Sequence, residues 1–275
     1  MNVADYTPGH CYARAQLLVA ELELIRAEMG RAKDERTLPA IANGSPREAY
    51  FGALAAWHKA TRLSDEVGIR VGRPAPSAPA IHQIRPGHVH QLIDATLLQV
   101  EDIRQLLGIT AKLPEFPVDP SKLPGDVFTA LTQANRLLSA VLERPFTPSD
   151  VYRVVALAAA YASRITNQHV ELEPYERYKQ PGDCYAKLES VLGQVNKLLE
   201  KRGEKVLSAQ AALTDVKPTD VYDLATLVMG EVAHLHALSP NVGPVQPFEP
   251  AGDGHRLPSH CFQLIRTLEA QLASL

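Results

Sequence analysis

Eight short segments of this chain resemble one another, and each of them begins with a proline. Neighbouring prolines of this set are separated by similar lengths of chain, except that Pro124 and Pro148 lie closer together. Self-similarity at a period of roughly 20 to 50 residues is typical of chains built from one repeated structural unit. The segments read PGHCY, PREAY, PGHVH, PGDVF, PSDVY, PGDCY, PTDVY and PSHCF, and they begin at Pro8, Pro46, Pro86, Pro124, Pro148, Pro181, Pro218 and Pro258.

The side chains that follow each proline predict an amphipathic helix. Offsets 3, 7, 10, 14 and 17 from the proline have the spacing of a helical seam, and in all eight segments every one of these positions is apolar except Thr96. Proline suits the first position of a helix because the N–H group that it lacks would have no partner there. Ser45 and Thr147 precede two of the prolines and begin capping boxes. The chain is therefore predicted to be all-α, with eight amphipathic helices.

Two architectures fit this pattern: helical bundles packed side by side, or a short α-solenoid. Proline-rich straps such as 71–85 and 239–257 connect the predicted helices. The short spacing in the middle of the chain suggests an N-terminal half over 1–145 and a C-terminal half over 146–275, which could also form one continuous domain. The short link at 144–147 predicts a tight helical hairpin.

Composition limits the classes of partner. Apolar residues make up 45% of the chain, which is enough for a substantial core, and the formal net charge of −3 argues against generic nucleic-acid binding. No apolar run approaches the roughly 18 residues of a membrane span, so no membrane insertion is predicted. The first residues show neither a basic segment nor an apolar stretch typical of a leader peptide. We expect a cytoplasmic protein, or a periplasmic or secreted one if a natural leader has been replaced.

Histidines at the helix starts suggest one candidate metal site. His10, His88 and His260 share offset 2, where a cationic side chain is disfavoured by the helix dipole, and Asp183 has the same offset. If their four helices run parallel in one cluster, three imidazoles and a carboxylate meet at one end and could bind zinc or another divalent ion. Alternatively, they are separate surface residues at helix starts. The chain has no contiguous metal motif, so no cofactor is predicted and a divalent metal is kept as a hypothesis.

Aromatic residues at offset 4 suggest a second candidate site. Seven of the eight copies have an aromatic ring there, which could line a ligand groove or could anchor the packing beside the seam. A feature of nearly every copy is explained more simply by folding. The three cysteines, all at offset 3, are interpreted as small buried hydrophobic residues. The residues of the predicted groove are Trp57, His58, Tyr50, Tyr152 and Tyr222.

The motifs that usually indicate catalysis are missing. The sequence contains no glycine-rich phosphate loop, no G-x-S-x-G and no H-E-x-x-H. The leading hypothesis is a non-catalytic helical-repeat scaffold or sensory module that binds a protein, a peptide or a small ligand, or that forms a homodimer. One alternative is a helical-bundle metal-binding protein or enzyme that uses the histidines at the helix starts. Another is a carrier of an apolar ligand.

Overall fold

A computed structural model describes residues 3–38, 40–69, 74–210, 213, 215–240, 242–245 and 254–275. These residues form eight α-helices, each of which begins at one of the eight prolines, so the prediction of an all-helical chain is confirmed. The helices are α1 (Pro8–Glu28), α2 (Pro46–Glu66), α3 (Pro86–Leu106), α4 (Pro124–Val141), α5 (Pro148–Thr166), α6 (Pro181–Glu200), α7 (Pro218–Ala237) and α8 (Pro258–Ala273). Two short 3₁₀ helices, η1 (Val3–Asp5) and η2 (Ile81–Gln83), precede α1 and α3. Of the two predicted straps, 71–73, 241 and 246–253 lie outside the described residues.

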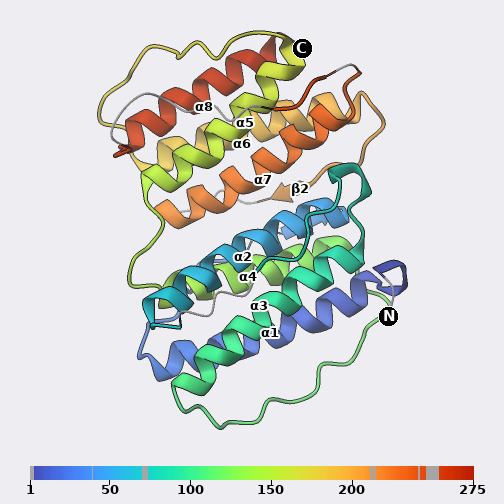
Figure 1. The fold of residues 1–275 in the computed structure, drawn as a ribbon, viewed down its shortest axis with the longest axis vertical. Helices are drawn as coiled ribbons and strands as arrows, with labels where there is room; N and C mark the ends of the chain where they lie inside the picture. Colours follow the sequence, from blue (N-terminus) through green and yellow to red (C-terminus); the bar gives the residue numbers. More distant parts are fainter. Residues whose placement is uncertain are drawn as a thin grey trace. The chain divides into compact units, whose positions relative to one another are not determined.

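The helices belong to two compact units. Unit 1 comprises Met1–Arg144 together with Leu207–Ala212, and unit 2 comprises the rest of the chain from Pro145. Unit 1 therefore holds α1 to α4, and unit 2 holds α5 to α8 (Figure 1). A short strand from the connection between α6 and α7, β2 (Ser208–Gln210), pairs antiparallel with β1 (Ala40–Asn43). The link at 144–147 joins α4 of unit 1 to α5 of unit 2, and the predicted helical hairpin stays a prediction.

Each unit is a closed four-helix bundle. In unit 1, α1 and α2 lie diagonally, and both pack against α3 and α4. In unit 2, α5 and α6 lie diagonally, and both pack against α7 and α8. Of the two architectures left open by the sequence, the structure therefore has the bundle. A solenoid would stack its helices in chain order.

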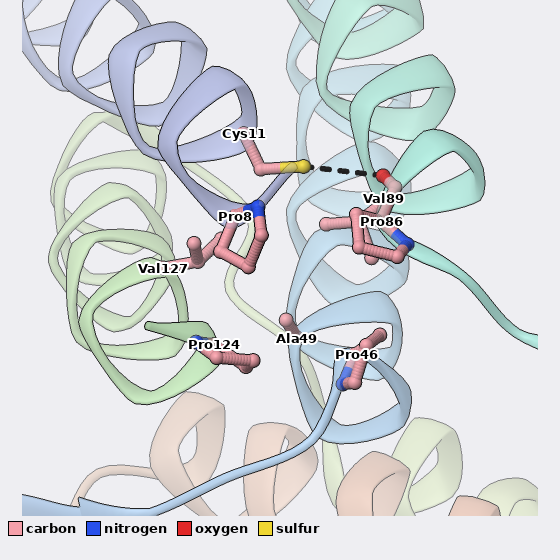
Figure 2. Close-up of a pocket in the computed structure, with 8 residues that line it drawn as sticks. All are labelled: Pro8, Cys11, Pro46, Ala49, Pro86, Val89, Pro124 and Val127. Atoms are coloured by element: carbon pink, nitrogen blue, oxygen red, sulfur yellow. Dashed lines mark hydrogen bonds between the residues drawn. The ribbon is translucent and has the colours of Figure 1, made fainter. Parts of the chain in front are cut away.

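All four helices of a unit run in the same direction. In unit 1 the four initial prolines surround one recess, as Figure 2 shows. Salt bridges between neighbouring helices join residues at similar distances from the helix starts. Arg14 of α1 pairs with Asp94 of α3 near the starts, and Glu21 of α1 pairs with Arg104 of α3 towards the ends. In unit 2 the four initial prolines likewise surround one recess. Parallel helices need connections that return along the full length of a helix. The straps can do this because extended chain covers about 3.3 Å per residue, whereas a helix covers about 1.5 Å per residue.

The core of each bundle consists of the seam positions. In all eight helices, the residues at offsets 3, 7, 10 and 14 are at most 3% exposed. Thr96, the polar exception on the seam, is fully buried, and its hydroxyl donates to the carbonyl oxygen of Leu92 at 2.8 Å. Seam residues are partly exposed only at offset 17, where Ile165 and Leu198 are half-buried and Leu275 is exposed. The repeated apolar pattern therefore builds the core.

Candidate functional site

The end of each bundle at which its four helices begin, called here the proline end, contains an apolar recess. Space of about 180 Å³ lies among the prolines of unit 1, and about 250 Å³ lies among those of unit 2, and both volumes include space that is open to solvent. Each recess is lined by the four initial prolines and the four residues at offset 3. The offset-3 residues are Cys11, Ala49, Val89 and Val127 in unit 1, and Val151, Cys184, Val221 and Cys261 in unit 2.

The residues just before a proline are called here its leading segment. At five helix starts the leading segment crosses the start of the next helix around the bundle, and its residue two positions before the proline covers the ring at offset 4 of that helix. The covered rings therefore anchor the leading segments. Five such pairs are seen: Tyr6 on His90 with ring centroids 4.1 Å apart, Lys122 Nζ 4.7 Å above the Tyr12 ring, Phe146 on Tyr222 with centroids 4.0 Å apart, Lys179 Nζ 4.2 Å above the Phe262 ring, and Arg256 4.8 Å above the Tyr152 ring.

The residue at offset 1 determines how closely a leading segment approaches. A Cβ atom at Gly87 would overlap the backbone of Val3, and one at Gly9 would overlap the carbonyl group of Asp119. In unit 2, the Ser149 hydroxyl instead donates to the carbonyl oxygen of a leading segment at 2.9 Å and accepts from a backbone N–H of the same segment at 2.9 Å. Glycine permits backbone contact at this position, and serine provides hydrogen bonds.

The cysteines at offset 3 belong to the same packing. Each Sγ donates to the carbonyl oxygen of the proline that begins a neighbouring helix, at 3.1 Å for Cys11, 3.3 Å for Cys184 and 3.0 Å for Cys261. Burial raises the pKa of Cys11 and of Cys184 to about 12, and it also raises the pKa of Cys261. The thiols are therefore protonated at neutral pH and are unsuited to nucleophilic or metal chemistry.

The side chain of the third residue of every helix caps the start of that helix. The backbone N–H that precedes the proline donates to the side chain at offset 2, at 2.7 to 3.2 Å in all eight helices. These acceptors compensate the positive ends of four parallel helix dipoles. Five of them are carboxylates and three are imidazoles: Glu48, Asp126, Asp150, Asp183, Asp220, His10, His88 and His260.

The four residues of the predicted metal cluster are divided between the units. His10 and His88 belong to unit 1, whereas Asp183 and His260 belong to unit 2. In each of them a side-chain atom caps its own helix: the Nδ1 atoms accept at 3.0 to 3.2 Å, and Asp183 accepts at 2.7 Å. Within the described part of the chain, no three His, Cys, Asp or Glu residues are grouped so as to hold a metal ion. A neutral imidazole accepts like a carboxylate, and this explains why histidine is tolerated at these helix starts.

One polar cluster in unit 1 was missed by the sequence reasoning. His90 Nδ1 lies 3.0 Å from Asp94, which also accepts from Arg14 at 2.7 Å. Burial by itself would raise the pKa of Asp94, but His90 and Arg14 hold that pKa below its usual value. The i, i+4 spacing of His90 and Asp94 on one helix was the available signal. Cys11 lies beside this cluster, but burial raises the pKa of its thiol to about 12 and so disfavours the thiolate that a nucleophilic triad needs.

The five predicted groove residues are divided between the units. Tyr50, Trp57 and His58 lie on α2, whereas Tyr152 and Tyr222 lie on α5 and α7. Tyr50, Tyr152 and Tyr222 are at most 7% exposed, and the latter two are covered by leading segments. Within either unit taken by itself, their positions give no support to a groove.

Comparisons with known proteins add no functional information. No family model, no curated protein and no solved structure matches the chain. None of the helices in the described ranges combines the length and the apolar character that a membrane span requires. Function must therefore be inferred from the geometry of the chain itself.

Proposed function

We propose that the protein is a non-catalytic binding module whose proline ends each bind an apolar side chain of a peptide or protein partner. The observation that carries this proposal is the recurrence of an apolar recess, framed by four prolines, at the same end of both bundles. The lining that each recess exposes is apolar throughout, so a partner would meet a preformed apolar surface.

The recess is shallow. Small-molecule sites usually enclose about 300 to 1,000 Å³. The space enclosed by each recess is about that of a single water molecule, so a carrier of a large apolar ligand is disfavoured. A partner's apolar side chain would rest over the ring of prolines. Apolar side chains at the centre of a contact usually contribute most of the energy of a protein–protein interface.

The chemistry of the surrounding groups favours binding over catalysis. The three thiols are protonated and donate to carbonyl groups, and the eight side chains at offset 2 cap their own helices. These groups are therefore engaged in holding the ends of the bundles. A partner would gain most of its binding energy from burial of apolar surface.

Selection of peptides from a displayed random library tests this proposal. The library is selected on the wild-type protein and counter-selected on a double variant, Ala49→Leu with Val221→Phe, in which both recesses are filled. We expect the enriched peptides to share one bulky apolar residue and to bind the filled variant at least roughly 10-fold more weakly, since an anchor residue contributes about 2 kcal/mol or more.

A second variant controls for nonspecific effects of mutation. Leu106→Ala removes an apolar side chain that is 57% exposed and lies at the opposite end of α3, and it should leave peptide binding unchanged. Filling a packed site can cost about 1 to 3 kcal/mol, so thermal unfolding must first show that the double variant folds. Peptides that bind the folded double variant as tightly as the wild type would overturn the proposal.

A further inference from the structure

Three of the eight helix starts are closed by imidazoles. His10 Nδ1 accepts from the Thr7 N–H at 3.2 Å and lies 2.8 Å from the Thr7 hydroxyl. The His88 Nδ1 atom accepts from the backbone N–H of Arg85 at 3.1 Å, and His260 Nδ1 accepts from that of Leu257 at 3.0 Å. A protonated Nδ1 carries a hydrogen and cannot accept, so each of these bonds requires the neutral ring.

We propose that the three imidazole caps make α1, α3 and α8 acid-sensitive, so that mild acid releases their leading segments while the other five helix starts stay closed. Protonation would place an N–H opposite the backbone N–H and a positive charge at a positive helix end. Carboxyl groups ordinarily lose their charge at a lower pH than imidazoles gain theirs. The inference depends on the capping geometry and not on occupancy of the recesses.

The surroundings of the three rings support this proposal. Burial and the Arg85 guanidinium lower the pKa of His88 below 6.5, and burial and Arg256 lower that of His260. The rings of Tyr6 and Tyr175 face His10 and His260, with centroids 5.8 and 5.1 Å away. Among the described ion pairs, none joins these three histidines to a carboxylate that would stabilise the charged ring. The carboxylates at the same ends cap their own helices: Glu48, Asp126, Asp150, Asp183 and Asp220.

The direction of the pH effect follows from these pKa values. The folded-state pKa of His88 and of His260 lies below the unfolded value of about 6.5, so the unfolded chain binds protons first. The stabilisation is complete above pH 6.5, and it is lost as the pH falls from there through the folded-state pKa. The segments released would be those that contain η1, η2 and residues 254–257. Of these, Tyr6 and Arg256 cover rings on the next helix.

Hydrogen exchange of the wild-type protein tests the proposal. Protection factors, corrected for intrinsic exchange, are measured by mass spectrometry at pH 7.5 and pH 5.5. Protection of the N–H groups at the starts of α1, α3 and α8 should fall roughly 2- to 30-fold, the equivalent of losing one helix cap. The starts of α2, α4, α5, α6 and α7 are internal controls and should change less than twofold. An equal fall at all eight starts, or no fall at the three, would overturn the inference.

A triple variant provides a second measurement. His10→Asp, His88→Asp and His260→Asp place at these positions the carboxylate that four other helices use. Protection at all three starts should then be the same at both pH values. A pH-dependent loss that persists in the folded variant would show that other groups are responsible.

Discussion

Replacing Gly87 by alanine should destabilise unit 1 by about 3 kcal/mol, near the upper limit for overpacking a tight site. The added Cβ would overlap the backbone of Val3, which belongs to the leading segment of α1. Backbone cannot move aside as the end of a flexible side chain can, so the leading segment must leave α3. Urea denaturation of the wild type and the variant measures the loss.

The same substitution at Gly182 is the matched control. Gly182 also has offset 1 from its proline, but nothing lies within 4 Å of a Cβ built there. Alanine favours a helix by about 0.5 to 1 kcal/mol over glycine, so Gly182→Ala should be neutral or stabilising. If both variants behave alike, the leading segment of α1 does not cross α3 as described.

Replacing Leu18 by alanine should destabilise unit 1 by about 2 to 5 kcal/mol, the range for truncating a buried leucine. Leu18 is at offset 10 of α1 and is fully buried on the seam. Thermal or urea denaturation measures the effect. The control is Leu98→Ala in α3, where the leucine is 43% exposed, and its effect should stay within about 0.5 kcal/mol. A loss of stability at Leu98 that matches the loss at Leu18 would contradict the assignment of the seam to the core.

The sequence was sufficient to predict the helices because the information for them is local. A proline, a residue that caps at offset 2 and an apolar seam lie within one short segment. Each helix start is therefore visible without knowledge of its neighbours. Thr96 shows the same locality, because its buried hydroxyl is satisfied by the carbonyl group one turn earlier in its own helix.

The arrangement around each bundle could not be predicted, because it depends on contacts between segments far apart in the chain. Nothing near Gly87 in the sequence indicates that Val3 crosses it. One signal was nevertheless present: an aromatic or basic residue stands two positions before five of the prolines, where it covers the next helix. Read together with the ring at offset 4, this pairing would have predicted the leading segments.

The histidines show why a shared offset does not determine the chemistry of a side chain. The pattern suggested either metal ligands or separate surface residues at helix starts. The position requires an acceptor for one backbone N–H, and a neutral imidazole provides it as well as Asp126 does. The protonation state of His88 depends on its burial and on Arg85, which the sequence pattern does not show.

Distances between spin labels on α2 and α3 test the parallel direction of the helices most directly. Asp65 and Gln105 are both exposed and share offset 19 from their initial prolines, whereas the exposed Gln91 has offset 5. The native cysteines are buried and should remain unlabelled. Parallel helices predict a short distance for the pair Asp65→Cys and Gln105→Cys, and a clearly longer one for the pair Asp65→Cys and Gln91→Cys, whose labels are offset along the helix axis by roughly 20 Å. If the first distance is instead the longer one, α2 and α3 are antiparallel. Their initial prolines could then not lie at the same end of the bundle, and the account would be contradicted.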